Sequence, residues 1–268
     1  MRNTPSANTR PRRLKPRHKK LLADRAILPE IAEARGYWTV EAPDELRHLG
    51  WAARGPKSPP AWLRPPGLAI PLHSVLEMEL GEQAATYSQF RPDRPARDKD
   101  GKVRKYVNPT GSQAVLDVNP GCHGSDLWLD RDTPLFIVEG VPKGDACWSA
   151  GLPAVSIQGV WNFTTTDENN YRELLKDLRY LPVAGREVVI AFDADAWTNP
   201  DVRAAARELG RVLSVGNSGA SRVSALKLPD PEKKLGIDDF LARGGGSESV
   251  LERIVKLEEL TGDRGVRL

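Results

Sequence analysis

The pattern of apolar and polar positions divides the chain into two parts that differ in character. In the first part, apolar residues recur at helical spacing over residues 20–35 and stop at Gly36, which predicts a helix that ends there. Residues 54–67 are rich in Pro and Gly and are expected to form a loop. Three strands are predicted, at residues 68–72, 83–90 and 104–107. We therefore expect a small α+β unit over residues 21–130.

In the second part, from about residue 131, short apolar strands alternate with helical segments. This alternation is typical of an α/β fold with a mostly parallel sheet flanked by helices. The predicted strands are residues 135–138, 154–157, 187–192 and 222–228. The predicted helices are residues 142–150, 169–180, 200–213 and 237–242. The sheet domain is expected to cover residues 131–245, and an amphipathic helix at 247–260 is expected to fill the C-terminal segment 246–268.

Positive charge is concentrated in two segments, although the net charge of the chain is only +3. Residues 1–20 contain eight Lys or Arg and no acid, which predicts a basic flexible tail. Residues 91–105 contain seven Lys or Arg against three Asp, around an Asp100-Gly101 turn signal. The second segment therefore predicts a hairpin with a basic ridge. Such segments bind phosphates without reading sequence, so we expect the first part to bind nucleic acid.

The composition excludes several classes of protein. Of the residues, 40% are hydrophobic and 28% are charged, as in ordinary globular proteins. No apolar run approaches the ~20 residues that a bilayer requires, so we expect no membrane association. The basic N-terminus is not followed by an apolar region, and the two cysteines are too few for a disulfide framework or a four-cysteine zinc site. We therefore expect a cytoplasmic protein.

Carboxylates follow two of the predicted strands directly. Strand 135–138 runs into Glu139-Gly140, and strand 187–192 runs into Asp193-Ala194-Asp195. Ligands of open α/β sheets gather at the carboxyl ends of the strands, and alternation along an extended chain would put Asp193 and Asp195 on the same side. If the strands are neighbours, Glu139, Asp193 and Asp195 converge and repel one another unless a cation lies among them. Oxygen ligands of this kind suit Mg²⁺. Each acid alone is also typical of a loop residue or a helix cap.

These residues resemble the Toprim domain, which bacterial-type (DnaG-like) primases share with topoisomerases and some nucleases. In that domain a Glu after the first strand and an Asp-x-Asp after a later strand hold Mg²⁺. Upstream, Ala85–Asp93, Gly101-Lys102 and Lys105–Ser112 are similar in order and spacing to the primase core, where a basic subdomain with a "KYxN" segment precedes the Toprim strand. Downstream, Gly236–Leu241 looks like the primase element in which an acidic pair closes the metal site. The likeness covers residues 27–245 and predicts a Toprim-like catalytic domain at 131–245.

The chain also departs from the primase pattern. Primases usually carry an acid four residues after the Glu, and this position is Lys143. Ala194 replaces the usual Gly between the two Asp, and Ala196-Trp197 replaces a small Ala-Gly pair. Lys143 would bind a phosphate or neutralise the carboxylates. The pattern looks closer to the divergent Toprim proteins of phages and mobile elements than to the replicative enzyme.

The resemblance implies RNA primer synthesis on single-stranded DNA from ribonucleoside triphosphates, with Mg²⁺ or Mn²⁺ as cofactor. In that hypothesis Asp193 and Asp195 hold the ions, Glu139 completes the coordination or accepts the 3′-hydroxyl proton, and Asp238 is a further ligand. Asp239 would cap a helix. The residues expected to hold template phosphates or the incoming nucleotide are Arg91, Lys102, Arg104, Lys105 and Tyr106, with Tyr87 and Phe90 as further candidates for stacking on a base or for the core.

Two other readings of the same residues stay open. With water in place of the 3′-hydroxyl, the same metal site would make a Toprim-type nuclease. The basic first part favours synthesis, because nucleases of this superfamily do not need it. A third reading is a non-catalytic DNA-binding accessory protein in which Lys143 marks the loss of the chemistry. A replicative helicase is a possible partner under the primase hypothesis.

Overall fold

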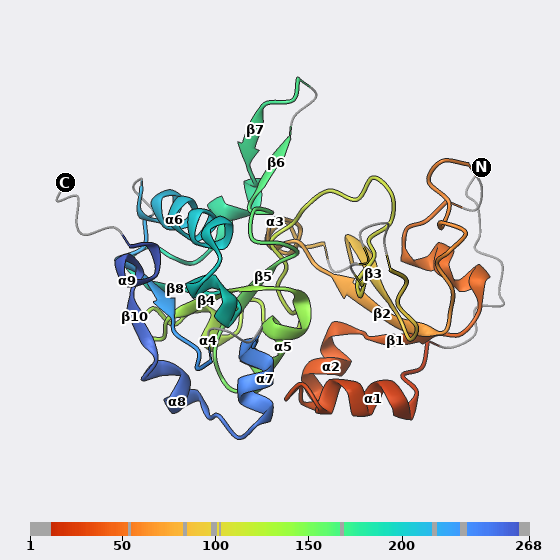
Figure 1. The fold of residues 1–268 in the computed structure, drawn as a ribbon, viewed down its shortest axis with the longest axis horizontal. Helices are drawn as coiled ribbons and strands as arrows, with labels where there is room; N and C mark the ends of the chain where they lie inside the picture. The colour runs from red at the N-terminus through yellow and green to blue at the C-terminus, as the bar shows by residue number, and fades with distance from the viewer. Residues whose placement is uncertain are drawn as a thin grey trace.

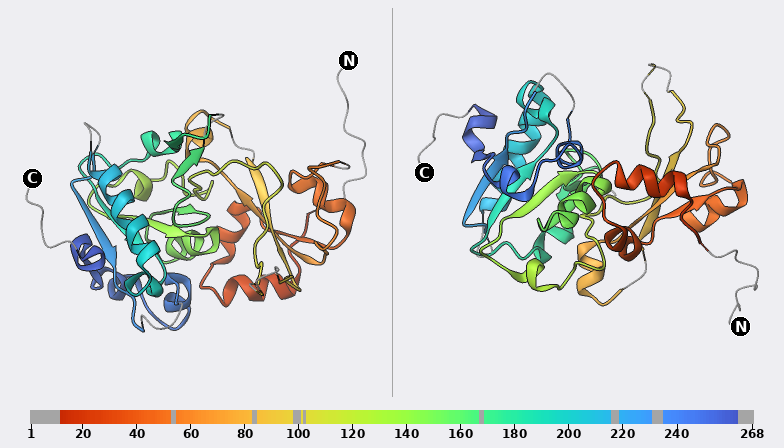
Figure 2. Two further views of the ribbon diagram at one scale, coloured as in Figure 1. Left: turned by 45° about the horizontal axis from the view of Figure 1, so that its top comes forward. Right: turned by 90° about the horizontal axis from the view of Figure 1, so that it is seen from below.

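The computed structural model describes residues 12–52, 55–82, 85–97, 101, 103–166, 169–215, 219–230 and 235–262. Two halves lie side by side along the long axis of the molecule (Figures 1 and 2). The N-terminal half contains α1 (Pro16–Ala23), α2 (Pro29–Arg35), β1 (Trp38–Val40), the 3₁₀ helix η1 (Pro43–Leu49), β2 (Gly67–Leu72), α3 (Val75–Glu79) and β3 (Tyr87–Pro92). Its three strands form an antiparallel sheet in the order β1-β2-β3. The smaller α+β unit that the sequence predicts is therefore present.

The C-terminal half is built on a five-stranded sheet in the order β10-β9-β8-β4-β5. The strands β4, β5, β8 and β9 are parallel, and β10 joins β9 antiparallel. The elements of this half are α4 (Asp126–Leu129), β4 (Leu135–Glu139), α5 (Val141–Ser149), β5 (Ala154–Ile157), β6 (Thr164–Thr166), β7 (Arg172–Leu174), η2 (Lys176–Tyr180), β8 (Glu187–Ala191), η3 (Ala194–Trp197), α6 (Pro200–Ser214), β9 (Arg222–Leu226), α7 (Ile237–Ala242), α8 (Ser247–Leu251), β10 (Ile254–Lys256) and α9 (Leu257–Thr261). This arrangement confirms the predicted mostly parallel sheet flanked by helices.

The order of the strands creates a crevice between β4 and β8. From β4 the chain moves outward through α5 to β5, and from β8 it moves outward in the opposite direction through α6 to β9. Because such crossovers are right-handed, α5 and α6 cover opposite faces of the sheet. The switch in direction falls between β4 and β8, which is where open α/β sheets bind their ligands.

The strands form where the sequence is continuously apolar. Leu135, Phe136, Ile137 and Val138 of β4 are fully buried, as expected of a central parallel strand that is covered on both faces. Helix α6 begins as predicted, because the Asn199 side chain accepts a hydrogen bond from the Asp201 amide. The main hydrophobic core is continuous across the two halves and includes Leu22 and Leu68 as well as the strands of the large sheet. The two predicted domains therefore share one core.

Near the N-terminus the structure corrects two predictions. The single helix predicted at 20–35 is two helices, because Ala26 has a φ of 59° and Pro29 starts α2. The predicted flexible tail is helical from Pro16, and His18 in that helix is buried between Thr39 and Asp93. Residues 1–11 lie outside the described residues.

In the predicted basic hairpin, the outgoing strand is confirmed and the return strand is not. The strand predicted at 83–90 is β3, which begins at Tyr87 and ends at Pro92. Residues 104–107 form no strand and make one antiparallel bridge, between Val107 and Phe90. Asp100 and Lys102 lie outside the described residues.

In the C-terminal half two predicted helices are wrong. Residues 169–180 form β7 and η2 instead, and β7 pairs with β6 in a hairpin that projects from the molecule (Figure 1). The helix predicted at 247–260 is interrupted by β10, since Ile254 and its neighbours pair with the free edge of β9. The sheet thus continues past the predicted boundary at residue 245. Among the described residues, no helix is long and apolar enough to span a bilayer.

Candidate active site between the two halves

The crevice between β4 and β8 places two of the predicted carboxylates together. Glu139 is the last residue of β4, and Asp193 follows β8 as the residue that starts η3. Asp193 is 5% exposed. Because β4 and β8 are paired in parallel, these two carboxyl ends meet at the same edge of the sheet. The expected convergence of Glu139 and Asp193 rests on this pairing.

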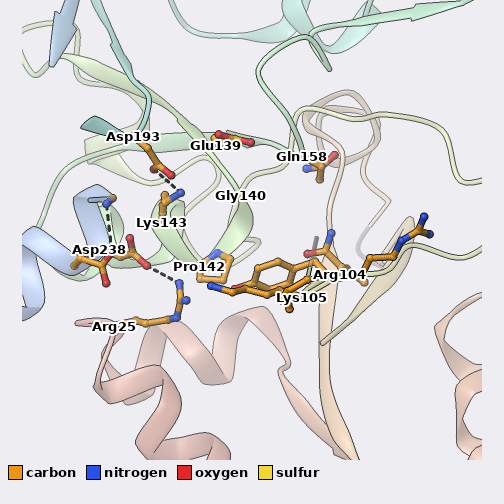
Figure 3. A pocket seen from close by; sticks show the side chains of 15 residues that line it. Arg25, Arg104, Lys105, Glu139, Gly140, Pro142, Lys143, Gln158, Asp193 and Asp238 are labelled. Carbon is orange, nitrogen blue, oxygen red and sulfur yellow. Dashed lines mark hydrogen bonds and ion pairs between the residues drawn. The ribbon is translucent and has the colours of Figure 1, made fainter. Parts of the chain in front are cut away.

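A lysine enters the crevice from the helix that follows β4. Gly140 has a φ of 97°, a left-handed conformation that favours glycine, and it turns the chain from β4 directly into α5. Lys143 in the first turn of α5 points toward Asp193, with its Nζ 2.6 Å from Asp193 Oδ1 (Figure 3). Burial disfavours the charge on Lys143, but Asp193, Asp238 and Glu139 outweigh it and raise the pKa of the ammonium. Lys143 is therefore a cation within a cluster of three carboxylates, those of Glu139, Asp193 and Asp238, which is called the carboxylate cluster below.

The third carboxylate comes from α7 and is held by an arginine from the N-terminal half. Asp238 lies in the first turn of α7, and Arg25, two residues after α1, places its Nη1 2.6 Å from Asp238 Oδ2. Burial raises the pKa of Asp238, against the lowering effect of Lys143 and Arg25. The other oxygen, Asp238 Oδ1, is buried and has no hydrogen-bond partner among the described residues. Asp239 caps α7, as predicted, because its Oδ2 accepts a hydrogen bond from the Gly236 amide.

The opposite wall of the site is basic and comes from the segment after the predicted turn. A cavity of about 760 Å³ is lined by the cluster of Glu139, Asp193 and Asp238 on one side and by Arg104 and Lys105 on the other (Figure 3). Tyr106 also lines it. Arg104 and Lys105 are exposed, and the Arg104 guanidinium also lies 5.8 Å from the Trp62 ring centroid. The cavity is therefore acidic where the sheet ends and basic where the N-terminal half closes it.

Most of the predicted site residues line this one cavity. They are Glu139, Lys143, Asp193, Asp238, Arg104, Lys105 and Tyr106. Arg91 and Asp195 do not line it. Lys102 lies outside the described residues. Tyr87 and Phe90, the further stacking candidates, are buried in the hydrophobic cores.

Asp195 lies outside the cavity because the chain is not extended where the prediction assumed it was. After Asp193 the backbone enters η3, which has three residues per turn, so alternate residues no longer share a side. The Asp195 carbonyl instead accepts hydrogen bonds from the Thr198 and Asn199 amides at the end of this turn. Asp195 therefore does not line the cavity beside Asp193.

The predicted metal set does not fit a divalent ion as these side chains lie. Within the described ranges, no three Asp, Glu, His or Cys side chains are grouped so that they could hold a metal ion. Asp193 and Asp238 offer the oxygen ligands that Mg²⁺ prefers, and Asp238 Oδ1 is unpartnered. However, the cation beside Asp193 is the ammonium of Lys143.

Three residues of the cavity with long polar side chains were missed by the sequence analysis. Arg25, Gln89 and Gln158 line it, from the turn after α1, from β3 and from the loop after β5. No local motif marks any of them. Gln158 directly follows a predicted strand, and this position at a strand's carboxyl end is the one signal that could have indicated it.

Two comparisons of the sequence with known proteins each match a part of this chain. Residues 126–248 match a family described as a domain of unknown function, DUF3854. An uncharacterized protein of Picosynechococcus sp. is 25% identical over 203 residues, which are 64% of this chain and 20% of that protein. The chain thus matches a minor part of that relative.

Solved structures of bacterial primases share the fold. The Aquifex aeolicus primase (zinc-binding and RNA polymerase domains) has a TM-score of 0.57 at 16% identity, over 89% of this chain and 55% of that one. The RNA polymerase domain of Mycobacterium tuberculosis primase DnaG, in complex with double-stranded DNA with a 6-nucleotide overhang, has a TM-score of 0.58 at 18% identity, over 91% and 75%. The E. coli primase catalytic core has a TM-score of 0.57 at 16% identity, over 91% of this chain and 74% of that one. This chain therefore has the fold of the DnaG primase catalytic core.

Proposed function

We propose that this protein transfers nucleotidyl groups on a single-stranded DNA template and makes short RNA primers from ribonucleoside triphosphates. The observation that carries the proposal is the composition of the cavity. The carboxylates and Lys143 lie where the strand order of the sheet switches direction, and they face a basic wall from the N-terminal half. The cavity between them has a volume of about 760 Å³. A polymerising site needs both a group that handles protons and phosphoryl charge and a surface that holds a nucleic-acid backbone.

The basic wall is the proposed contact with template and nucleotide. Arg104 and Lys105 are exposed cations on the rim and would bind phosphates, and the half-buried Tyr106 beside them would stack on a base. The Mycobacterium tuberculosis domain of the same fold was crystallised with DNA. This supports a DNA partner for the present chain.

The acidic side is the proposed centre of the chemistry. Glu139 ends β4 on the wall of the cavity and would take the proton from the attacking 3′-hydroxyl. Lys143 would offset negative charge on the phosphoryl group next to Asp193. Asp238, held by Arg25, would keep α7 closed over this side.

The cofactor proposed from the sequence, Mg²⁺ or Mn²⁺, would reach the site together with the nucleotide. Mg²⁺ is commonly held by one or two protein carboxylates plus the phosphates of a substrate. It would supply charge neutralisation on the triphosphate when bound. Omission of the ion, or addition of a chelator, is expected to abolish synthesis.

The test is a primer-synthesis assay. The purified protein is incubated with single-stranded DNA, four ribonucleotides, one of them labelled, and Mg²⁺ or Mn²⁺, and the products are resolved on a sequencing gel. Labelled oligonucleotides that are absent with an Asp193→Asn variant are the expected result. Lys256→Ala, which changes an exposed lysine on β10, serves as the matched control and should retain synthesis.

Two other outcomes would replace the proposal. Shortening of an end-labelled template in the same reaction would identify a nuclease. An unchanged template that shifts in a native gel, with no labelled product, would identify a DNA-binding accessory protein. A role in the replication of a phage, plasmid or other mobile element, and a helicase partner, remain predictions from the family resemblance.

A further inference from the structure

Lys143 lies within the carboxylate cluster and is largely shielded from solvent. Its side chain is 16% exposed, and the side chains of Asp193 and Asp238 are 6% and 1% exposed. The Nζ atom is 2.6 Å from Asp193 Oδ1 (Figure 3). This closeness and burial distinguish the pair from a surface ion pair, which solvent would screen.

Gly236 shows how tightly the three side chains converge. A Cβ atom at Gly236 would clash with Asp238 Oδ1, would lie 2.5 Å from Lys143 Cε and would lie 3.3 Å from Asp193 Oδ1. The two carboxylates and the lysine therefore surround a single point. The end of the Lys143 side chain lies against Asp193 Oδ1 at this point, and Asp238 Oδ1 lies beside the same point.

The position of Lys143 limits which cation the carboxylate cluster can accept. Two buried carboxylates repel one another and need a neighbouring cation. A divalent ion would meet this need with oxygen ligands around it at about 2.0–2.6 Å. An ammonium offers no lone pair to a metal and repels it. Lys143 on one side and Arg25 on the other already supply positive charge to Asp193 and Asp238.

We propose that Lys143 is the resident cation of the carboxylate cluster. It takes the place of a divalent ion between Asp193 and Asp238, so that the free protein holds its carboxylates together without a metal. The inference goes beyond the proposed function, because it concerns the free protein and stands whichever reaction the site supports.

The test measures metal binding in the absence of nucleotide and DNA. Wild type, Lys143→Met and Lys143→Arg are compared by the loss of the free Mn²⁺ signal in electron paramagnetic resonance and by the shift of Tm on addition of Mg²⁺. We expect Mg²⁺ to leave the Tm of wild type and of Lys143→Arg unchanged. We expect Lys143→Met to be less stable without metal, to be stabilised by Mg²⁺ and to bind Mn²⁺ at least about tenfold more tightly than wild type.

A double variant locates the gained site. Adding Asp193→Asn to Lys143→Met should remove the Mn²⁺ binding and the Mg²⁺-dependent rise in Tm. If Lys143→Met does not fold, Lys143→Gln takes its place, and Mn²⁺ binding and the Mg²⁺-dependent shift of Tm are compared between this variant and wild type. A wild-type protein that binds Mn²⁺ as tightly as Lys143→Met or Lys143→Gln, and whose Tm rises equally with Mg²⁺, would overturn the inference. Because no readout uses primer synthesis, failure of the proposed function would be seen separately.

Discussion

The Arg25 guanidinium and the Asp238 carboxylate form an ion pair across 213 positions of sequence, with Nη1 2.6 Å from Oδ2. Arg25 belongs to the N-terminal half and Asp238 to α7 of the C-terminal half. Both line the cavity. The pair therefore fixes one side of the candidate active site to the other.

Removal of Arg25 should destabilise the protein through Asp238. In an Arg25→Gln variant the buried carboxylate loses its guanidinium partner, and we expect the free energy of unfolding to fall by ~2 kcal/mol, less than the ~3–5 kcal/mol for fully buried pairs because Arg25 is partly exposed. Urea denaturation measures the change. Lys20→Gln, which removes an exposed pair with Asp24 in the same region, is the control and should have little effect. Equal stability of the two variants would contradict the role of the pair.

A second buried ion pair joins α2 of the N-terminal half to α5. Arg35 Nη1 lies 2.5 Å from Asp117 Oδ1, and Arg35 Nη2 lies 2.8 Å from Asp145 Oδ1. All three side chains are buried. An Arg35→Met variant leaves two buried carboxylates without their cation, and we expect a loss of about 3–5 kcal/mol in urea denaturation. Arg211→Met, which removes an exposed pair on α6, should change stability far less. A loss no larger than in this control would show that the buried pair does not hold the halves together.

His73 should make the protein less stable in mild acid. Burial, with a smaller effect of Arg35, lowers its pKa from 6.5 to about 4, so the unfolded chain takes up a proton between these values and the folded protein does not. Stability present above pH 6.5 is therefore lost as the pH falls toward 4, by up to about 3 kcal/mol. His73→Leu should lose less stability than wild type over this range in urea denaturation.

Asp117 titrates in the same range with the opposite sign. Burial raises its pKa to about 7, so the folded protein binds the extra proton and stability from this group falls as the pH rises from about 4 to 7. Asp117 is present in wild type and in His73→Leu. The difference between the two pH profiles therefore isolates His73, and parallel profiles would refute its assignment.

The basic wall predicts a specific change in salt dependence. If Lys105 contacts a DNA phosphate, Lys105→Ala should weaken single-strand binding and reduce the slope of log K against log salt by about 0.7. Fluorescence anisotropy at several salt concentrations measures the slope. Lys256→Ala changes another exposed lysine, on β10, and should leave the slope unchanged. The same slope in both variants would place the DNA elsewhere.

Asp193 and Asp195 should differ in their effect on activity. Asp193 lines the cavity and pairs with Lys143, whereas Asp195 lies in η3 and does not line it. In the primer-synthesis assay we expect Asp193→Asn to lose activity by about 100-fold or more and Asp195→Asn to lose much less. Equal losses would restore the sequence-based assignment, in which both carboxylates act together.

Much of the fold could be predicted because its central strands are apolar without interruption. Residues 135–138 and 188–191 are buried on both faces of a parallel sheet, and such runs are visible in the sequence. The acids that end these strands follow from the same pattern, which is why Glu139 and Asp193 were found. The capped start of α6 at Asn199 is likewise local.

Only the tertiary structure decided the elements and contacts that depend on a distant partner. Ile254–Lys256 became a strand because β9 offers an unpaired edge; Ile254 and Val255 favour strands, but two such residues are too few to predict one without that edge. Arg25 reached Asp238 because α2, which follows Arg25 in the chain, packs against α5 of the sheet domain, and Asp195 left the cavity because the backbone turned into η3. The sequence by itself determined the apolar strands and the charges at their ends. The identity of the cation beside Asp193, which is Lys143, was decided by packing, because its geometry depends on α5, η3 and α7 meeting at one point.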